Sequence, residues 1–142
     1  MRDFLILGWM MLVTGISVSA QEYTLDITVS GIHSDKGAIY LSLYNNEKGF
    51  PKDPKSAFRL VHARIVNGIS TFRLDKLPKG IYAVACYHDE NGNGKLDANF
   101  FGIPTEGTGS SNNASGFLGP PKFQNAKFSL DRDTAIIIRI RY

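Results

Sequence analysis

The sequence predicts an all-β fold, an antiparallel β-sandwich of about seven short strands. Hydrophobic residues alternate with polar ones along several segments, and a period of two is typical of strands with one buried face. Clusters of Gly, Asn, Asp and Pro separate these segments, as turns do. No segment after residue 20 shows a sustained helical period with caps, apart from a possible turn near residues 53–57. Together these observations favour a sandwich over a helical architecture.

The expected strands follow one another along the chain with turns between them. Asn67 and Gly68 lie between two strand-like runs and predict a two-residue hairpin turn, because both residue types tolerate positive φ. Residues 81–87 are apolar on both faces, which predicts a central strand covered on both sides. In the last strand, alternate residues are expected to face inward: Ile136, Ile138, Ile140 and Tyr142. The strands are expected at residues 23–30, 39–44, 58–66, 81–87, 122–130 and 134–142, with a further return strand that begins at Phe72 and Leu74.

The first 20 residues have the pattern of a secretory signal peptide. One arginine precedes an apolar run at residues 4–13, and small residues end the segment at Ala20. The apolar run is too short for a permanent membrane-spanning helix. We therefore expect cleavage before Gln21, export to the periplasm or secretion, and no stable membrane insertion of the remaining β-sandwich domain, residues 21–142. An uncleaved N-terminal anchor is the alternative.

Charge and cysteine content restrict the possible partners and chemistry. The net charge is +3, and the basic residues are scattered without a run or stripe, so nucleic acid is not an expected partner. Cys86 is the single cysteine and lies in the apolar run of the expected central strand. We expect it to be a small buried hydrophobic residue and not a nucleophile.

Residues 89–97 have the spacing of a calcium-coordinating loop. Asp89, Asn91, Asn93 and Asp97 stand at positions one, three, five and nine, where such loops place oxygen ligands. A glycine is needed at position six for the sharp turn, and the chain has one there. At position seven the ligand is a backbone carbonyl, which Lys95 can supply. The bidentate acid of position twelve is missing.

A tight turn is the alternative interpretation of this segment, because two Asn-Gly pairs follow each other within it. A turn alone does not need acids at both ends, whereas a hard cation needs six to eight converging oxygens. Only Asp89 and Asp97 contribute certain carboxylates, so a dissociation constant of roughly 10⁻⁴ to 10⁻³ M is expected. Calcium would then serve structure and not signalling.

Residues 92–121 are rich in Gly, Pro, Asn and Ser, and they predict one long loop that begins at the calcium-like segment. Loops of this length in small domains are usually functional or disordered. Large apolar residues inside it predict a packed, ordered loop and not a free one, because disordered segments lack them. These residues are Phe100, Phe101, Ile103, Phe117 and Leu118.

Several blocks of the sequence together resemble one bacterial family. They are Leu77 to Val84, His88 to Asp97, Phe101 to Gly107, Ser111 to Ala114 and Gly119 to Phe123. The combination resembles the exported family named domain of unknown function 2141 (DUF2141), over nearly all of residues 21–142. The resemblance implies a small exported β-domain with no established activity.

A second resemblance is to calcium-binding β-sandwich modules of the transthyretin-like and adhesin type. These also place a Leu-Pro-x-Gly-x-Tyr segment before an Asp-x-Asn-x-Asn-Gly-x-x-Asp segment, as residues 77–82 and 89–97 do here. The likeness implies a transthyretin-like or immunoglobulin-like sandwich in which the loop binds calcium. It also implies a further ligand soon after the loop, and Glu106 is the matching residue.

The sequence predicts a binding or interaction module with an unknown ligand or envelope partner. Phe100, Phe101, Asn112 and Asn113 are the residues that could supply its contact surface. The alternative is an enzyme acting on a small molecule or an envelope glycan beside the loop, with Glu106, His88 and Asp97 as the available acid or base groups. No catalytic residue is assigned. A small outer-membrane barrel is a minor alternative, which the long loop disfavours because it leaves too few residues for strands.

Overall fold

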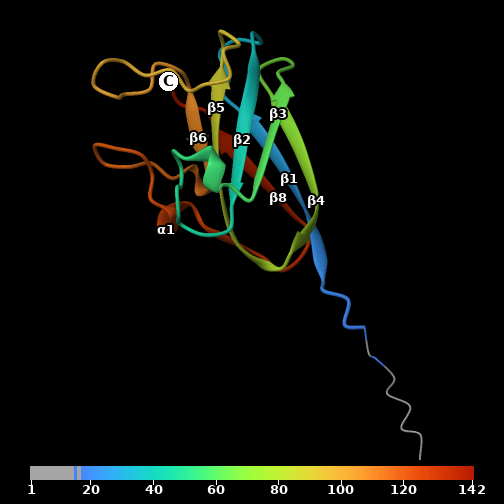
Figure 1. Cartoon of the computed structure of the whole chain (residues 1–142). Helices are drawn as coiled ribbons and strands as arrows, with labels where there is room; N and C mark the ends of the chain where they lie inside the picture. The colour runs from blue at the N-terminus through green and yellow to red at the C-terminus, as the bar shows by residue number, and fades with distance from the viewer. Residues whose placement is uncertain (1–14, 16) are drawn as a thin grey trace, which may run out of the picture.

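The computed structural model describes residue 15 and residues 17–142. The expected signal peptide, residues 1–20, lies mostly outside the described residues. The described residues form eight strands in two sheets, so the prediction of an all-β sandwich is confirmed (Figure 1). The elements are β1(Glu22–Ser30), β2(Ala38–Tyr44), η1(Pro54–Ser56), β3(Arg59–Arg64), β4(Ser70–Pro78), β5(Gly80–Asp89), β6(Thr108–Ser110), η2(Ser111–Asn113), α1(Phe123–Ala126), β7(Phe128–Leu130) and β8(Thr134–Arg139).

The first sheet has three strands in the order β4-β1-β8. Leu25, Ile27 and Val29 of β1 point into the core and are at most 1% exposed, as the alternation predicts. β1 runs antiparallel to β4 and parallel to β8. The expectation of a wholly antiparallel sandwich is therefore wrong at this one pair. Parallel neighbours need a long connection, and here nearly the whole domain lies between the two strands.

The second sheet contains β3-β2-β5-β6, with β7 paired to the beginning of β5. β5 is its central strand, and residues 82–86 are at most 9% exposed although successive side chains point to opposite faces. The prediction that this strand is covered on both sides is confirmed. One side faces the first sheet, and the other lies under the loops that follow β2 and β6 (Figure 1).

The Asn67-Gly68 turn forms as predicted, and it joins the two sheets. Val66 and Ile69 exchange two backbone hydrogen bonds across it, of 2.8 and 3.1 Å. Both turn residues have positive φ, 51° and 72°. The Asp35 carboxylate accepts hydrogen bonds from both turn N–H groups. β3 pairs with β2, whereas β4 pairs with β1, so this hairpin is a corner of the sandwich.

Residues 92–121 do not form one long loop, because β6 and η2 interrupt it. β6 pairs with β5 through Thr108, Gly109 and Ser110. A Cβ atom on Gly109 would lie 2.8 Å from a methyl carbon of Ile138, so only glycine lets this short strand approach the core. The buried hydroxyl of Ser111 accepts a hydrogen bond from the Val84 N–H and donates one to the Ala126 carbonyl. The segment is therefore two loops fixed at their bases.

The helical elements are short. The turn expected near residues 53–57 is η1, and the Asp53 side chain caps it by accepting from the Lys55 N–H. The strand expected at 122–130 is a strand only in β7, because residues 123–126 form α1, whose Ala126 is completely buried. Within the described residues, no helix is long and apolar enough to cross a bilayer.

Cys86 is 5% exposed, and burial raises the pKa of its thiol to about 12. Since the thiolate is the reactive form, we expect no reaction with an aromatic disulfide reagent at pH 8 in the native protein and stoichiometric reaction in denaturant. Absorbance of the released thiolate measures both. Rapid labelling of the native protein would contradict the placement of Cys86 in the core.

Candidate functional site

The calcium-like segment begins at the buried end of the central strand. Asp89 is the last residue of β5 and is 1% exposed. Its Oδ1 accepts hydrogen bonds from the N–H groups of Gly92 and Asn93 at 2.9 and 3.1 Å, and its Oδ2 accepts from Gly94 at 2.8 Å. Burying a carboxylate is costly unless donors compensate for the lost water, and these three N–H groups do so. The loop therefore folds around Asp89.

The structure brings three more of the predicted ligand residues together above Asp89. The amide nitrogen of Asn91 donates to Oδ2 of Asp97 at 2.6 Å. Asn93 donates from its amide nitrogen to both Asp97 oxygens, at 2.9 and 3.0 Å. The amide oxygens of Asn91 and Asn93 accept from the N–H groups two residues later, as in Asx turns. Hydrogen bonds within one loop thus connect the predicted ligand residues Asp89, Asn91, Asn93 and Asp97.

Glu106 closes the loop from outside. One of its carboxylate oxygens accepts from the N–H of Glu90 at 3.2 Å, and the other accepts from the N–H of Asp97 at 3.1 Å. The two donors are at opposite ends of the loop, so a single carboxylate brings these ends together. Glu106 is partly buried there. In the described structure Glu106 therefore braces two backbone groups, and its expected role as a calcium ligand stays a prediction.

The donor set of the loop fits a hard cation. Carboxylate oxygens of Asp89 and Asp97, amide oxygens of Asn91 and Asn93 and the carbonyl of Lys95 are all oxygen ligands of the kind that calcium takes. Glu106 would complete six, the lower limit for calcium. In the described structure, the amide nitrogens of Asn91 and Asn93 donate to the Asp97 carboxylate, where a cation would otherwise balance its charge. With an ion bound, the amide oxygens of these two residues would face the ion instead of the nitrogens.

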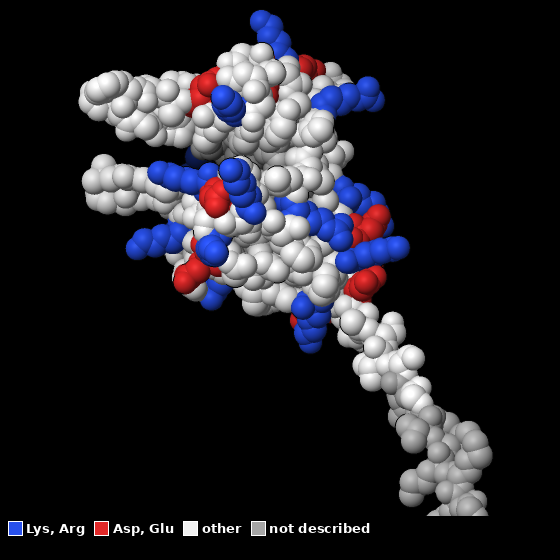
Figure 2. Space-filling view, in the orientation of Figure 1, with Lys and Arg blue, Asp and Glu red and all other residues white. Residues whose placement is uncertain are grey.

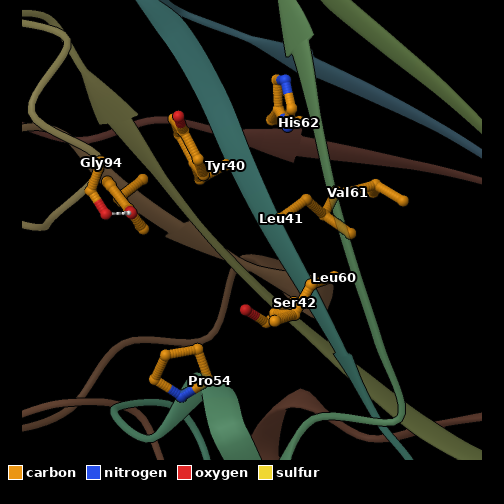
Figure 3. Close-up of a pocket in the computed structure, with 9 residues that line it drawn as sticks. Tyr40, Leu41, Ser42, Pro54, Leu60, Val61, His62 and Gly94 are labelled. Carbon is orange, nitrogen blue, oxygen red and sulfur yellow. Dashed lines mark hydrogen bonds between the residues drawn. The ribbon is translucent and has the colours of Figure 1, made fainter.

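Tyr87 connects this loop to the outer face of the second sheet. Its hydroxyl donates to the Gly94 carbonyl at 3.1 Å, as drawn in Figure 3. Burial raises the pKa of Tyr87 to about 12, and the charges of Asp89 and Glu106 act in the same direction. The hydroxyl therefore keeps its proton at neutral pH and remains a donor. This hydrogen bond therefore links β5 to the loop at residues 89–97.

A row of aromatic rings lies across the same face. Tyr40 stacks on Tyr87 with ring centroids 5.4 Å apart and on His62 with centroids 5.2 Å apart. The three residues are cross-strand partners on β5, β2 and β3. They border a shallow cavity of about 280 Å³, which Ser42, Pro54 and the Gly94 end of the loop also line (Figure 3). Sequence reasoning missed this row, because pairing between three strands decides which rings meet.

The groups expected for acid–base chemistry are engaged in structural hydrogen bonds. The His88 side chain is completely buried, with its ring nitrogens 2.7 Å from the Tyr142 hydroxyl and the Lys36 carbonyl. Both oxygens of Glu106 accept backbone hydrogen bonds. Asp97 accepts from two asparagine amides. A general acid or base must reach the substrate, and the aromatic cavity beside the loop is lined by other residues.

The first loop ends in an ordered apolar tip. The Asn99 side-chain oxygen accepts from the N–H groups of Phe101 and Ile103, both at 3.0 Å, and two backbone hydrogen bonds close the same turn. Phe100 is 97% exposed and Phe101 82% exposed. The turn therefore presents two aromatic rings and Ile103 to the outside, so the prediction that these residues pack within the loop is wrong.

The second loop has a similar tip on the same side of the molecule. Phe117 and Leu118 are 95% and 94% exposed. A Cβ atom on Gly116 would lie 2.1 Å from the carbonyl oxygen of Gly119, so the chain can turn back this closely only with glycine. Both loops project from one side of the sandwich, and their ends carry neither acidic nor basic side chains (Figure 1, Figure 2).

The expected contact residues divide into two groups. Phe100 and Phe101 are exposed as expected. The amides of Asn112 and Asn113 instead hold the base of the second loop: Asn112 donates to the carbonyls of Asn125 and Lys127, and Asn113 accepts from the Arg139 N–H. Tyr142, expected inward, is 56% exposed, because the β8 ladder ends at Arg139.

We expect Glu106→Gln to lower the free energy of unfolding by about 1.5 to 3 kcal/mol, because hydrogen bonds to a charged group have about that value. The glutamine side chain would keep one acceptor oxygen and would place an amide nitrogen against a backbone N–H. Urea unfolding measures the change, with Glu47→Gln at an exposed position as the matched control. Equal stability of the two variants would contradict the bracing role.

Comparison with known proteins identifies a family but no relative of established activity. No curated protein and no solved structure matches the chain, so the resemblance to transthyretin-like and adhesin modules is not confirmed. A family model described as "uncharacterized protein conserved in bacteria (DUF2141)" matches residues 27–137. This range runs from β1 into β8 and includes the calcium-like loop and both apolar tips. The chain therefore belongs to the bacterial DUF2141 family.

Proposed function

We propose that the protein is an exported binding module that attaches reversibly to a lipid surface through its two apolar loop tips, with calcium stabilising the first loop. The observation that carries this proposal is the exposure of four large side chains at two ordered tips. Phe100, Phe101, Phe117 and Leu118 are each at least 82% exposed.

Such exposure is costly unless a partner covers it. Burying a side chain of this size is favourable by about 1.5 to 3 kcal/mol, and exposed apolar patches usually mark interaction sites. Here the apolar residues stand on two separate projections and not in one concave site (Figure 2). Two separate tips can enter a soft lipid interface together, whereas a single protein pocket would accept one of them.

The charge of the second loop supports an anionic lipid surface. Residues 107–130 contain Lys122 and Lys127 and no Asp or Glu. Basic residues beside inserted apolar groups are attracted to anionic headgroups, at about 1 kcal/mol for each Lys or Arg near the surface. The expected export would bring the protein to the membranes of the cell envelope.

Calcium has a structural role in this proposal. The turn that carries Phe100 and Phe101 starts two residues after Asp97, and Asp97 is also tied to Glu106 and to Thr105 through its backbone. An ion bound by Asp89 and Asp97 would fix the base from which the tip projects. Binding of the lipid surface would then require less ordering of the loop.

An enzyme acting beside the loop is less supported. Its expected acid and base groups are engaged in structural hydrogen bonds, as the contacts of His88 and Glu106 show. The apolar tips, in contrast, have no structural task within the described fold.

Calcium titration tests the metal. With a dissociation constant of roughly 10⁻⁴ to 10⁻³ M, about 10 mM calcium should stabilise the protein by about 1.4 to 2.7 kcal/mol. Calorimetry and thermal unfolding measure this, and Asp97→Ala should abolish both the heat and the stabilisation. Asp131→Ala, which removes an exposed acid elsewhere, is the control. No heat and no stabilisation of the unsubstituted protein would remove calcium from the proposal.

Vesicle sedimentation tests the loop tips. We expect the protein to bind vesicles of mixed phosphatidylglycerol and phosphatidylcholine. The double variants Phe100→Ser/Phe101→Ser and Phe117→Ser/Leu118→Ser should each bind at least about tenfold more weakly, since about 1.4 kcal/mol is less than one buried side chain contributes. The bound fraction at increasing lipid concentration measures the change.

The matched control for the vesicle experiment is Leu60→Ser/Ile137→Ser. These side chains are 58% and 68% exposed but lie on the strands and not on the tips. Vesicle binding should be unchanged in this variant. Equal loss in all three double variants, or no binding by the unsubstituted protein, would overturn the lipid contact.

A further inference from the structure

A second group of metal-binding side chains lies next to the calcium-like loop. His33 comes from the connection between β1 and β2, His88 from the end of β5 and Glu90 from the residue after β5. One ligand atom from each of the three lies within 4.8 Å of the other two. We propose that His33, His88 and Glu90 form a binding site for a transition-metal dication of the zinc type.

Two of the three ligands already meet at the surface. Glu90 Oε2 is 3.1 Å from His33 Nε2, and the two side chains are 37% and 49% exposed. An ion can therefore reach this pair from solvent without any opening of the core.

His88 supplies the third ligand and is already oriented. Its Nε2 is 2.7 Å from the Lys36 carbonyl. A carbonyl can only accept, so Nε2 carries the hydrogen and Nδ1 carries the lone pair. Metal-binding histidines commonly donate their second nitrogen to a backbone carbonyl in this way. The contact depends on Gly37, where an added Cβ would lie 1.8 Å from the Asp89 carbonyl oxygen.

In the described structure, the Tyr142 hydroxyl is hydrogen-bonded to Nδ1 of His88, the atom that would bind the ion. The hydroxyl is 2.7 Å from Nδ1 and also accepts from the His33 N–H. The Tyr142 ring stacks on the His33 ring at 3.7 Å. When an ion binds, this hydroxyl gives up its bond to Nδ1. Tyr142 is 56% exposed, so its side chain can move toward solvent.

The donor atoms decide which ion each site takes. Two imidazole nitrogens and one carboxylate oxygen are a known ligand set of zinc, with a fourth position open. Calcium takes oxygen ligands, so the loop of Asp89 to Asp97 and the His33 site select different ions. Because Glu90 follows Asp89 directly, zinc would tie the connection between β1 and β2 to the base of the calcium-like loop.

Titration calorimetry with zinc chloride tests this site on the purified protein without a polyhistidine tag. We expect one ion per chain. His33→Ala and Glu90→Gln should each weaken binding at least about tenfold, since even outer-shell partners of metal-bound histidines contribute that much. His62→Ala removes an exposed histidine on β3 and is the matched control. Asp97→Ala should keep zinc affinity, which separates this result from failure of the calcium proposal.

A second measurement identifies the ligand atoms. Nitrogen-15 NMR of the imidazole rings should show zinc-dependent shifts at Nδ1 of His88 and Nε2 of His33, with none at His62. No zinc binding, equal loss in the His62→Ala control, or unchanged affinity in both His33→Ala and Glu90→Gln would overturn the site.

Discussion

The buried carboxylate of Asp89 is the constraint on which the fold of the loop after β5 depends. The central strand β5 ends in a residue that is charged and almost without solvent contact. Its two oxygens require donors, and the N–H groups of Gly92, Asn93 and Gly94 satisfy them only if the chain turns sharply back. The position of the loop is therefore fixed by an electrostatic requirement of the core, before any ion is considered.

Beyond Asp89, a few polar contacts fix the rest of the first loop. Asp97 is held by two asparagine amides, Glu106 holds both ends of the loop, and Asn99 closes the turn that carries Phe100 and Phe101. The second loop is fixed in the same manner by Ser111 and Asn112. Polar side chains thus form the bases of both loops, and apolar side chains form the tips. Because polar contacts fix the bases, the loops can keep their conformation while their apolar tips are exposed to water. The same conformation would then be available for the proposed lipid contact.

The proposed calcium and zinc sites meet at the end of β5, but only the calcium site has a pattern that can be seen in the sequence. The calcium-like residues stand within nine consecutive positions, so their spacing is visible in the sequence. His33 and Glu90 are separated by 57 positions and Tyr142 and His88 by 54. No local pattern connects such residues. The packing of the β1 to β2 connection, and of the residues after β8, against the end of β5 brings them together. The Tyr40, His62 and Tyr87 row is hidden from the sequence for the same reason.

The sequence by itself determined the strands with a clear period of two, the Asn67-Gly68 turn, the buried central strand and the loop around Asp89. These features follow from local rules: alternation, positive φ and the spacing of polar residues at 89–97. The tertiary structure alone decided the parallel pairing of β1 with β8, the short strand β6, the bracing role of Glu106 and the structural use of Asn112 and Asn113. Each of these depends on contacts between segments that are distant in the sequence. The positions of neighbouring strands determine which groups a side chain can contact, and the conformational preference of the residue itself does not.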